Sequence, residues 1–237
     1  MIPHQKEFWW GSYLPRLTIR CYIHWNLRWY NGTYNQHDHD PGKPAGAAPI
    51  LPREPRQTVL RFTLEVPRLS GAVDLLPVIA EETLIMRIDP SAGAMLTVTG
   101  QIRSHNQRTD GIRHLMIFVF AASITAEDGE PINDVVLEGP LCKEPTFRRT
   151  PLGREICDAM LAVPRAFRRA DYLPCILWGR TAQEISACHT RDCIRICGRL
   201  QSRVYTKLTE DGPKERTAYE ISALTAQILD DPYDASL

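Results

Sequence analysis

The chain has 237 residues, with 28 Lys and Arg against 28 Asp and Glu, so its formal net charge is zero. This length suffices for one large or two compact domains, and the composition is typical of a globular chain. No apolar run reaches the roughly 18–20 residues that span a bilayer, and the first thirty residues lack the layout of a secretory signal. We therefore expect a cytoplasmic protein with no membrane partner. A neutral total also argues against a nucleic-acid partner, unless the charges are unevenly placed.

Residues 1–58 differ from everything after them. Four of the five tryptophans lie here, but neither helical nor strand periodicity persists. Five prolines between Pro41 and Pro55 argue against a regular element in that stretch. We expect an irregular or disordered segment, and one hypothesis is that it is read from a shifted frame or a wrong start.

The rest of the chain contains two sets of predicted strands, rich in Val, Ile, Leu and Phe and separated by Gly, Asp, Asn or Pro. The first set is Arg61–Val66, Leu75–Ala80, Met95–Arg103 and His114–Ile124. The second set is Asp134–Leu141, Ile156–Val163, Tyr172–Trp178, Cys193–Tyr205 and Thr217–Ile228, with a short helix over Thr181–Cys188. Five strands with a helix between the third and the fourth predict an OB-fold, a small Greek-key barrel.

The two sets form an internal repeat. A shift of 97 residues places Leu64-Glu-Val-Pro-Arg68 on Leu161-Ala-Val-Pro-Arg165 and Asp74 on Asp171, and a shift of 98 places Gly100 on Gly198. The fold class is therefore mainly β, a tandem OB-fold. The first barrel is expected to be incomplete or degenerate, because no first strand with its glycine is recognisable before Val59. We expect a degenerate repeat at 59–130, a second barrel at 131–229 and a short acidic tail at 230–237.

Cysteines and histidines carry two weak metal signals. Seven cysteines without an export signal predict reduced thiols. One group contains metal-ligating residue types, namely Cys188, His189, Cys193 and Cys197. Its spacings match no paired pattern of structural zinc. The pair His37 and His39 is better interpreted as part of a polar loop, so we expect no metal and no cofactor.

The second repeat has the residue types that capture a polyanion. Alternation on the strand that ends at Tyr205 puts apolar residues on one face and Arg191, Arg195, Arg199 and Arg203 on the other. Tyr172 and Trp178 share a face of their strand, and Phe167 precedes them in a basic loop. Aromatic rings stack on unpaired bases, while guanidinium groups follow the phosphates. The alternative is a solvated face whose arginines pair with acids on a neighbouring strand.

The placement of charge favours the first interpretation. Residues 131–207 hold 13 Lys and Arg against 8 Asp and Glu, a net charge of +5. Residues 208–237 hold 2 against 7, a net charge of −5, and residues 1–130 hold 13 of each. The neutral total therefore conceals a basic barrel.

These features resemble the bacterial single-stranded DNA-binding proteins, well over about Asn133–Ile228 and weakly over Leu60–Ile124. The resemblance rests on Val135-Val-Leu-Glu-Gly139, Thr150-Pro-Leu-Gly-Arg-Glu-Ile156, Asp171 through Arg180, and Gly198-Arg-Leu-Gln-Ser-Arg-Val-Tyr205. It implies sequence-tolerant binding and protection of single-stranded DNA during replication, recombination and repair. The implied stacking residues are Phe167, Tyr172, Trp178 and Tyr205. The expected phosphate contacts are Arg165, Arg168, Arg169, Arg180, Arg195, Arg199 and Arg203.

The resemblance also has consequences for assembly. The two-barrel arrangement is similar to a variant in Gram-positive anaerobes, and four barrels around DNA imply a homodimer in the nucleoid-associated cytoplasm. The family's acidic tail recruits replication or repair enzymes, but here Asp230–Leu237 follows no linker. The first repeat has Ser70, Leu75, Glu81 and Gln107 at the four aromatic positions. We expect it to serve packing or assembly.

Two other functions remain open at this stage, and a third is not expected. The barrels could scaffold a complex through an acidic protein partner, or the basic face could bind RNA. An enzyme is not expected, because the sequence contains no Gly-rich phosphate loop, nucleophile elbow or HExxH motif. Glu184, Cys188 and His189 lack a third orienting group for a Cys/His hydrolase.

Overall fold

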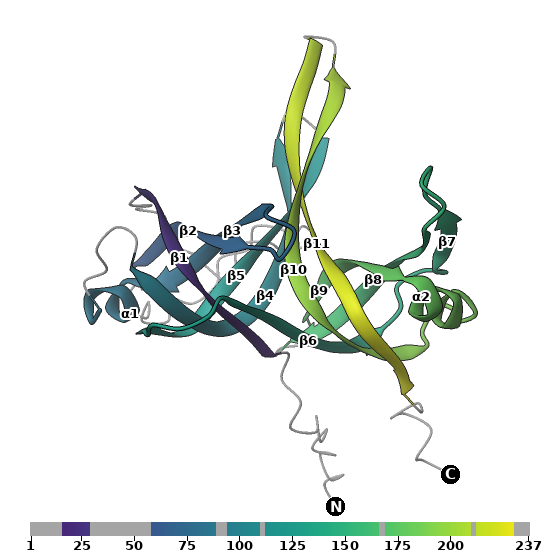
Figure 1. The fold of residues 1–237 in the computed structure, drawn as a ribbon, viewed down its shortest axis with the longest axis horizontal. Coiled ribbons are helices and arrows are strands. Elements are labelled where there is room, and N and C mark those ends of the chain that lie inside the picture. The colour runs from purple at the N-terminus through teal and green to yellow at the C-terminus, as the bar shows by residue number, and fades with distance from the viewer. Residues whose placement is uncertain are drawn as a thin grey trace, which may run out of the picture. The chain divides into compact units, whose positions relative to one another are not determined.

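The computed structural model describes residues 16–28, 58–88, 94–109, 112–165, 169–209 and 212–229. These residues form mainly strands, which confirms the predicted fold class (Figure 1). The strands of the first repeat are β1 (Arg16–Arg28), β2 (Val59–Pro67), β3 (Val73–Glu81), β4 (Met95–Thr109) and β5 (Ile112–Ala126). Those of the second are β6 (Ile132–Pro140), β7 (Thr146–Arg149), β8 (Glu155–Arg165), β9 (Arg169–Trp178), β10 (Cys193–Thr209) and β11 (Gly212–Leu229). The short helices are α1 (Glu82–Met86) and α2 (Gly179–Ser186), and no helix in these ranges is long and apolar enough to cross a membrane.

The first repeat is a closed barrel. Its strands are hydrogen-bonded in the order β1-β2-β3-β5-β4, and β4 neighbours β1 again. The parallel contact of β3 with β5 pairs Ile79 with Phe120. Inward residues such as Leu64, Leu76 and Val78 are fully buried. This strand order, with α1 between the third and fourth strands, is that of an OB-fold.

β1 departs from the expectation that residues 1–58 form no regular element and that the first repeat lacks its first strand. It pairs antiparallel with β2, with His24 opposite Thr63, and the register shifts between His24 and Arg28. The sequence does alternate along this strand, with apolar residues at every second position, namely Leu17, Ile19, Cys21, Ile23, Trp25 and Leu27. The prediction for residues 1–58 overlooked this period. The strand contains no glycine, unlike β6, which contains Gly139. The other residues before Thr58, including His37 and His39, lie outside the described residues, so the frame-shift idea stays a hypothesis.

The second repeat has the same topology. Its strands are ordered β6-β10-β11-β9-β8, and the parallel contact of β9 with β11 pairs Ile176 with Ser222. A bridge between Leu141 and Leu161 returns β8 to the end of β6. The predicted helix is present as α2, between β9 and β10. β7 is an addition that pairs with β8 only.

The glycines that the repeat aligned have the same structural role in each barrel. A Cβ atom on Gly100 would lie 2.2 Å from the carbonyl oxygen of Phe120, and one on Gly198 would lie 2.2 Å from that of Ser222. No side chain fits at such a distance, so each glycine allows the fourth strand to approach the fifth closely.

The aligned arginine and aspartate also have one role. Arg68 contacts Asp74 at 2.7 and 2.5 Å, and Arg165 contacts Asp171 at 3.2 Å. Both aspartates are buried, so each needs its charged partner. The pair joins the ends of the second and third strands in both barrels.

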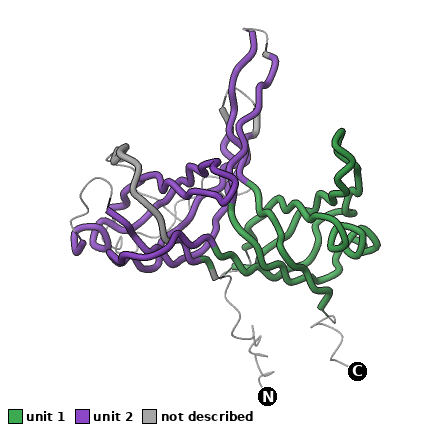
Figure 2. Tube along the Cα trace, viewed as in Figure 1, with its two compact units in different colours: residues 1–17, 134–200, 220–237 green, residues 18–133, 201–219 purple. Residues whose placement is uncertain are grey.

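The chain divides into two compact units (Figure 2). One contains residues 1–17, 134–200 and 220–237, and the other contains 18–133 and 201–219. The outer part of the β10–β11 hairpin is therefore grouped with the first barrel, although its sequence belongs to the second repeat. The sequence-based domain boundaries remain a prediction.

Candidate nucleic-acid interface

The outward face of β9 carries the two predicted aromatics. Burial alternates along the strand, and the inward side chains of Asp171, Leu173, Cys175 and Leu177 are all buried. Tyr172 and Trp178 point outward and remain 49% and 38% exposed. The predicted sharing of one face by these two residues is confirmed.

A hydrogen bond fixes the ring of Trp178. Its indole Nε1 donates to the Oγ of Ser222 on β11, at 3.2 Å. Ser222 is buried, so its hydroxyl has little access to water. The ring is therefore tied at its polar edge while part of its surface stays open, which suits a stacking platform.

β7 adds basic side chains that the sequence analysis did not assign to the site. In the strand ladder Arg148 lies opposite Ile156, which lies opposite Trp178. Arg148 contacts Asp158 at 2.5 Å, and its hydrogen bond to this carboxylate raises the pKa of the guanidinium. Arg149 contacts Glu155 at 2.7 Å, and this hydrogen bond, together with one from Gln183, lowers the pKa of Glu155. The signal available was the Arg148-Arg149 pair, but a four-residue strand has no readable period.

Two arginines on the outward face of β10, Arg195 and Arg199, differ in their hydrogen-bond partners. Arg195 lies directly opposite Glu138 on β6 and pairs with it. Arg199 has a buried Nε atom without a hydrogen-bond partner in the described part of the chain. The interpretation of a paired, solvated face thus holds for Arg195, whereas the Nε of Arg199 lacks an acceptor.

Three other predicted arginines, Arg165, Arg169 and Arg180, lie near the ends of β9. Arg165 is bound to the buried Asp171 and is opposite Arg169, which is exposed at the start of β9. Arg180, at the start of α2, has an 89% exposed side chain and contacts Glu184 at 3.3 Å. Phe167 and Arg168 lie outside the described residues.

Arg203 and Tyr205 lie in the other unit, on the outer part of β10. The Cζ atom of Arg203 is 5.6 Å from the ring centroid of Tyr205, a cation–π contact. Tyr205 is 39% exposed. The structure therefore places Tyr172 and Trp178 on one face of β9, and Arg203 beside Tyr205 on β10.

The first barrel has a different outer face. Leu75 stands at the position of Tyr172 and is exposed, and Glu81 stands at that of Trp178. The strand registers make Phe120 the counterpart of Ser222. Arg103 lies over the Phe120 ring, with its Cζ atom 5.7 Å from the centroid. This barrel has no indole–serine pair among its described residues.

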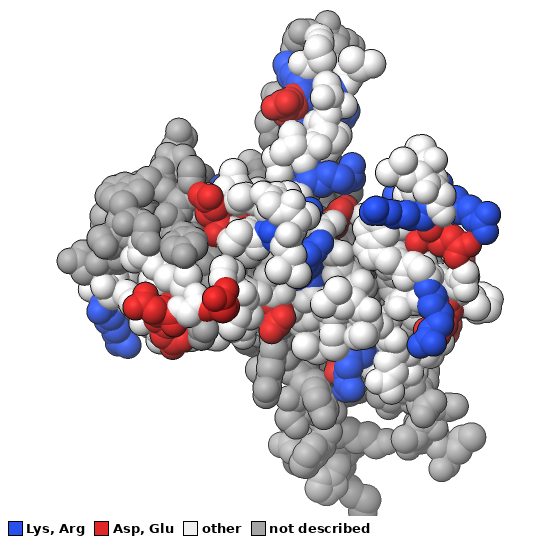
Figure 3. Space-filling model, viewed as in Figure 1, with Lys and Arg blue, Asp and Glu red and all other residues white. Residues whose placement is uncertain are grey.

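Charge is uneven over the surface. On the face drawn in Figure 3, Lys and Arg side chains lie along the β10–β11 hairpin and around β7, with acidic side chains among them. This face therefore carries side chains of both signs rather than a purely basic patch.

The cysteines offer little chemistry. Within the described ranges, no three His, Cys, Asp or Glu side chains form a group that could hold a metal. Cys157, Cys175 and Cys188 are buried, and burial raises the pKa of the Cys157 thiol to about 11. Such a thiol is protonated and unreactive at neutral pH.

Two closed five-stranded barrels with the same order of strands, one of them bearing an anchored indole on its outer face, define a tandem OB-fold protein. Comparison with known proteins gives the family. A profile described as "Single-strand binding protein family" matches residues 132–229. Single-stranded DNA-binding protein B of Bacillus subtilis is 33% identical over 105 residues, which are 41% of this chain and 90% of that protein. The chain belongs to the single-strand binding protein family.

Other relatives and solved structures agree. Single-stranded DNA-binding protein 1 of Lactococcus lactis is 34% identical over 106 residues, covering 42% of this chain and 69% of its own. The structure is similar to the wild-type single-stranded DNA binding protein from Thermus aquaticus, with a TM-score of 0.66 and 19% identity. The match covers 92% of this chain and 93% of that one. A deletion mutant of that protein gives a TM-score of 0.67 at 18% identity, with coverage of 94% and 98%. At this identity the likeness shows the fold alone.

Proposed function

We propose that the chain binds single-stranded DNA through its second barrel, with little preference for sequence. The observation that carries this proposal is the exposed ring of Trp178, held by the Oγ of Ser222 on the face that it shares with Tyr172. A ring fixed before binding loses little conformational freedom when a base stacks on it. Each stacked base contributes about 1–3 kcal/mol, and every base has a π-face. The names of the relatives, as single-stranded DNA-binding proteins, support the same ligand.

The phosphates of the strand would contact exposed arginines of the second repeat. We assign this role first to Arg169 and Arg180, and next to the half-buried Arg199. Arg203 and Tyr205 on the outer part of β10 are further proposed contacts, as are Phe167 and Arg168. Arg165 and Arg195 are ion-paired and only 12% and 32% exposed, so we assign them to the stability of the barrel.

The biological role that follows is protection of single-stranded DNA during replication, recombination and repair. We propose a cytoplasmic, nucleoid-associated protein without enzymatic activity, acting as a dimer of two-barrel chains. The repeat at 59–130 would serve packing, and the barrel at 131–229 would bind the DNA. Replication or repair enzymes are the proposed protein partners.

The test compares Trp178→Ala with Glu81→Ala, the matching position of the first barrel. Labelled oligo-dT is titrated with each full-length variant at low salt, and anisotropy gives the affinity. We expect Trp178→Ala to weaken binding about 5- to 100-fold and Glu81→Ala to leave it unchanged. Equal losses from both variants would reject the assignment to the second barrel. Absence of wild-type binding at low salt would reject the function, and stronger binding of oligo-rU would reassign the ligand to RNA.

A further inference from the structure

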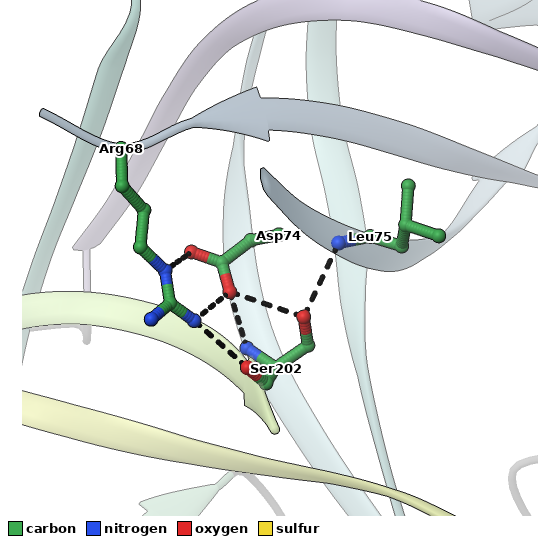
Figure 4. A network of polar contacts seen from close by, with 4 residues as sticks. All are labelled: Arg68, Asp74, Leu75 and Ser202. Atoms are coloured by element: carbon green, nitrogen blue, oxygen red, sulfur yellow. Dashed lines mark hydrogen bonds and ion pairs between the residues drawn. The ribbon is translucent and has the colours of Figure 1, made fainter. Parts of the chain in front are cut away.

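Ser202 on β10 is held by two side chains of the first barrel. Asp74 Oδ1 accepts hydrogen bonds from the backbone N–H of Ser202 at 2.6 Å and from its Oγ at 3.0 Å (Figure 4). Arg68 Nη2 donates to the carbonyl oxygen of Ser202 at 2.8 Å. The backbone N–H of Leu75 donates to the Oγ of Ser202 at 3.3 Å. One residue of β10 thus makes four contacts with β3 and the end of β2.

These contacts replace a strand ladder. The pairing of β10 with β6 ends at Gly198 opposite Val135, four residues before Ser202. A backbone N–H and C=O need partners wherever water is excluded. At Ser202 a carboxylate and a guanidinium take this part, and the carboxylate is completely buried. Charge-assisted bonds of this kind are short and directional.

The contact fixes the start of the outer part of β10, which carries two of the proposed DNA contacts. Arg203 follows Ser202 directly, and Tyr205 lies three residues beyond it. Both side chains are exposed, and β10 continues to Thr209. A strand anchored at its base has fewer orientations at the next few residues, so Arg203 and Tyr205 are presented in one arrangement.

We propose that Asp74 and Arg68 are positioning residues for DNA binding, which act through Ser202 to orient Arg203 and Tyr205. The first barrel has no aromatic at the positions of Tyr172 and Trp178, but it directs a strand of the second repeat that carries two of the site residues. This inference rests on the proposed function. The Arg68–Asp74 ion pair alone does not support this role, because Arg165 and Asp171 form the same pair in the other barrel. The role rests on the contacts to Ser202.

The test is a double-mutant cycle on the full chain, with oligo-dT as the probe. Tyr205→Ala is measured in the wild type and in Ser202→Ala. This variant removes the two Oγ contacts and keeps the two backbone contacts and the Arg68–Asp74 pair. We expect Tyr205→Ala to weaken binding about fivefold or more in the wild type and less than twofold in Ser202→Ala. Ser202→Thr retains the hydroxyl and should restore the wild-type response. Asp74→Asn should reproduce the loss if it folds, and Ser202→Ala decides if it does not.

Salt dependence adds a measurement that a general loss of stability would not change. The loss of one phosphate contact reduces the slope of log K against log salt by about 0.7 for single-stranded DNA. We expect this reduction in Ser202→Ala and in Arg203→Gln, and no further reduction in the double variant. Glu127→Gln is the matched control, because Glu127 accepts hydrogen bonds from Thr97 and Thr125 in the same unit. It should leave affinity and slope unchanged.

The outcomes separate the two proposals. If the wild type does not bind oligo-dT, the proposed function fails. If the wild type binds and Trp178→Ala weakens it, but Tyr205→Ala costs the same in both backgrounds, the positioning role is overturned and the function stands. A Tyr205→Ala variant that binds like the wild type also overturns the positioning role.

Discussion

The β2–β3 hairpin of the first barrel and the β8–β9 hairpin of the second share an ion pair and a strand pairing, but their outward side chains differ. In both, an arginine at the end of the second strand binds a buried aspartate on the third. In both, the third strand runs parallel to the fifth at an isoleucine, Ile79 or Ile176. The two hairpins therefore share their ion pair and their strand pairing.

The outward residues at the proposed DNA-binding positions differ between the repeats. Tyr172 and Trp178 of β9 correspond to Leu75 and Glu81 of β3, and the anchor Ser222 corresponds to Phe120. The inward positions share one barrel core, so their residues are restricted by packing. Outward positions contact solvent or a ligand and can diverge after duplication. The comparison separates what builds the barrel from what we propose binds DNA.

The largest expected effect tests the shared frame. Asp74→Ala and Asp171→Ala should each lower the free energy of unfolding by about 3–5 kcal/mol, because each leaves an arginine in a largely buried site without its carboxylate. Asp74→Ala also removes the two hydrogen bonds from Ser202. Urea unfolding gives the total loss, and hydrogen exchange of β2–β3 and β8–β9 shows which barrel opens.

Each variant is the control for the other. Asp74→Ala should open β2–β3 first, and Asp171→Ala should open β8–β9 first. A loss below about 1 kcal/mol for either aspartate would break the comparison, because that hairpin would then be held by something other than the ion pair.

The second effect tests the aligned glycines. Gly100→Ala and Gly198→Ala should each cost about 1–3 kcal/mol or more, since the new Cβ atom would lie 2.2 Å from a carbonyl oxygen. Thermal unfolding measures both. Gly139→Ala sharpens the comparison, because its Cβ atom would lie 2.3 Å from the carbonyl oxygen of Ala162 and β1 has no glycine at all. It should destabilise the second barrel alone, and a neutral result would mean that β6 can move away from β8.

The sequence predicted these shared features well, and for a physical reason. Strands buried on one face alternate, so the inward set of β10, from Ile194 to Leu200, was visible without a structure. The repeat also aligned Arg68 with Arg165 and Asp74 with Asp171. It did not reveal that they pair, because the partners lie six residues apart across a turn. Arg165 was therefore assigned to phosphate from its charge alone.

Three features were missed for different reasons. β1 alternates in the sequence from Leu17 to Leu27, and it was missed because residues 1–58 were treated as one irregular segment. β7 has only four residues, all of them exposed, so nothing marked it as a strand. The contact of Asp74 with Ser202 joins residues 128 positions apart, and no local pattern reports such a contact.

A third experiment transfers the surface. Leu75→Tyr combined with Glu81→Trp gives the first barrel the two aromatics of β9. We expect tighter binding of a long oligo-dT by about 1 kcal/mol, roughly fivefold, the low end for one stacked base, because Phe120 offers the new indole no hydroxyl. Anisotropy with oligo-dT of increasing length measures the gain. An unchanged affinity at every length would show that the barrels differ in more than these side chains.

The smallest effect concerns the anchor itself. Ser222→Ala removes the acceptor of the Trp178 indole N–H and keeps the ring. A neutral hydrogen bond contributes about 0.5–1.5 kcal/mol, and the low end is expected here, a loss of two- to threefold in affinity, because the half-exposed indole can turn toward water. Ser222→Thr keeps the hydroxyl and should bind like the wild type. Trp178→Phe should weaken binding as much as Ser222→Ala does, and adding Ser222→Ala to Trp178→Phe should weaken binding no further. If Ser222→Ala weakens binding as much as Trp178→Ala, the serine contacts the DNA itself. The second barrel would then differ from the first in a direct serine–DNA contact as well as in its stacking aromatics.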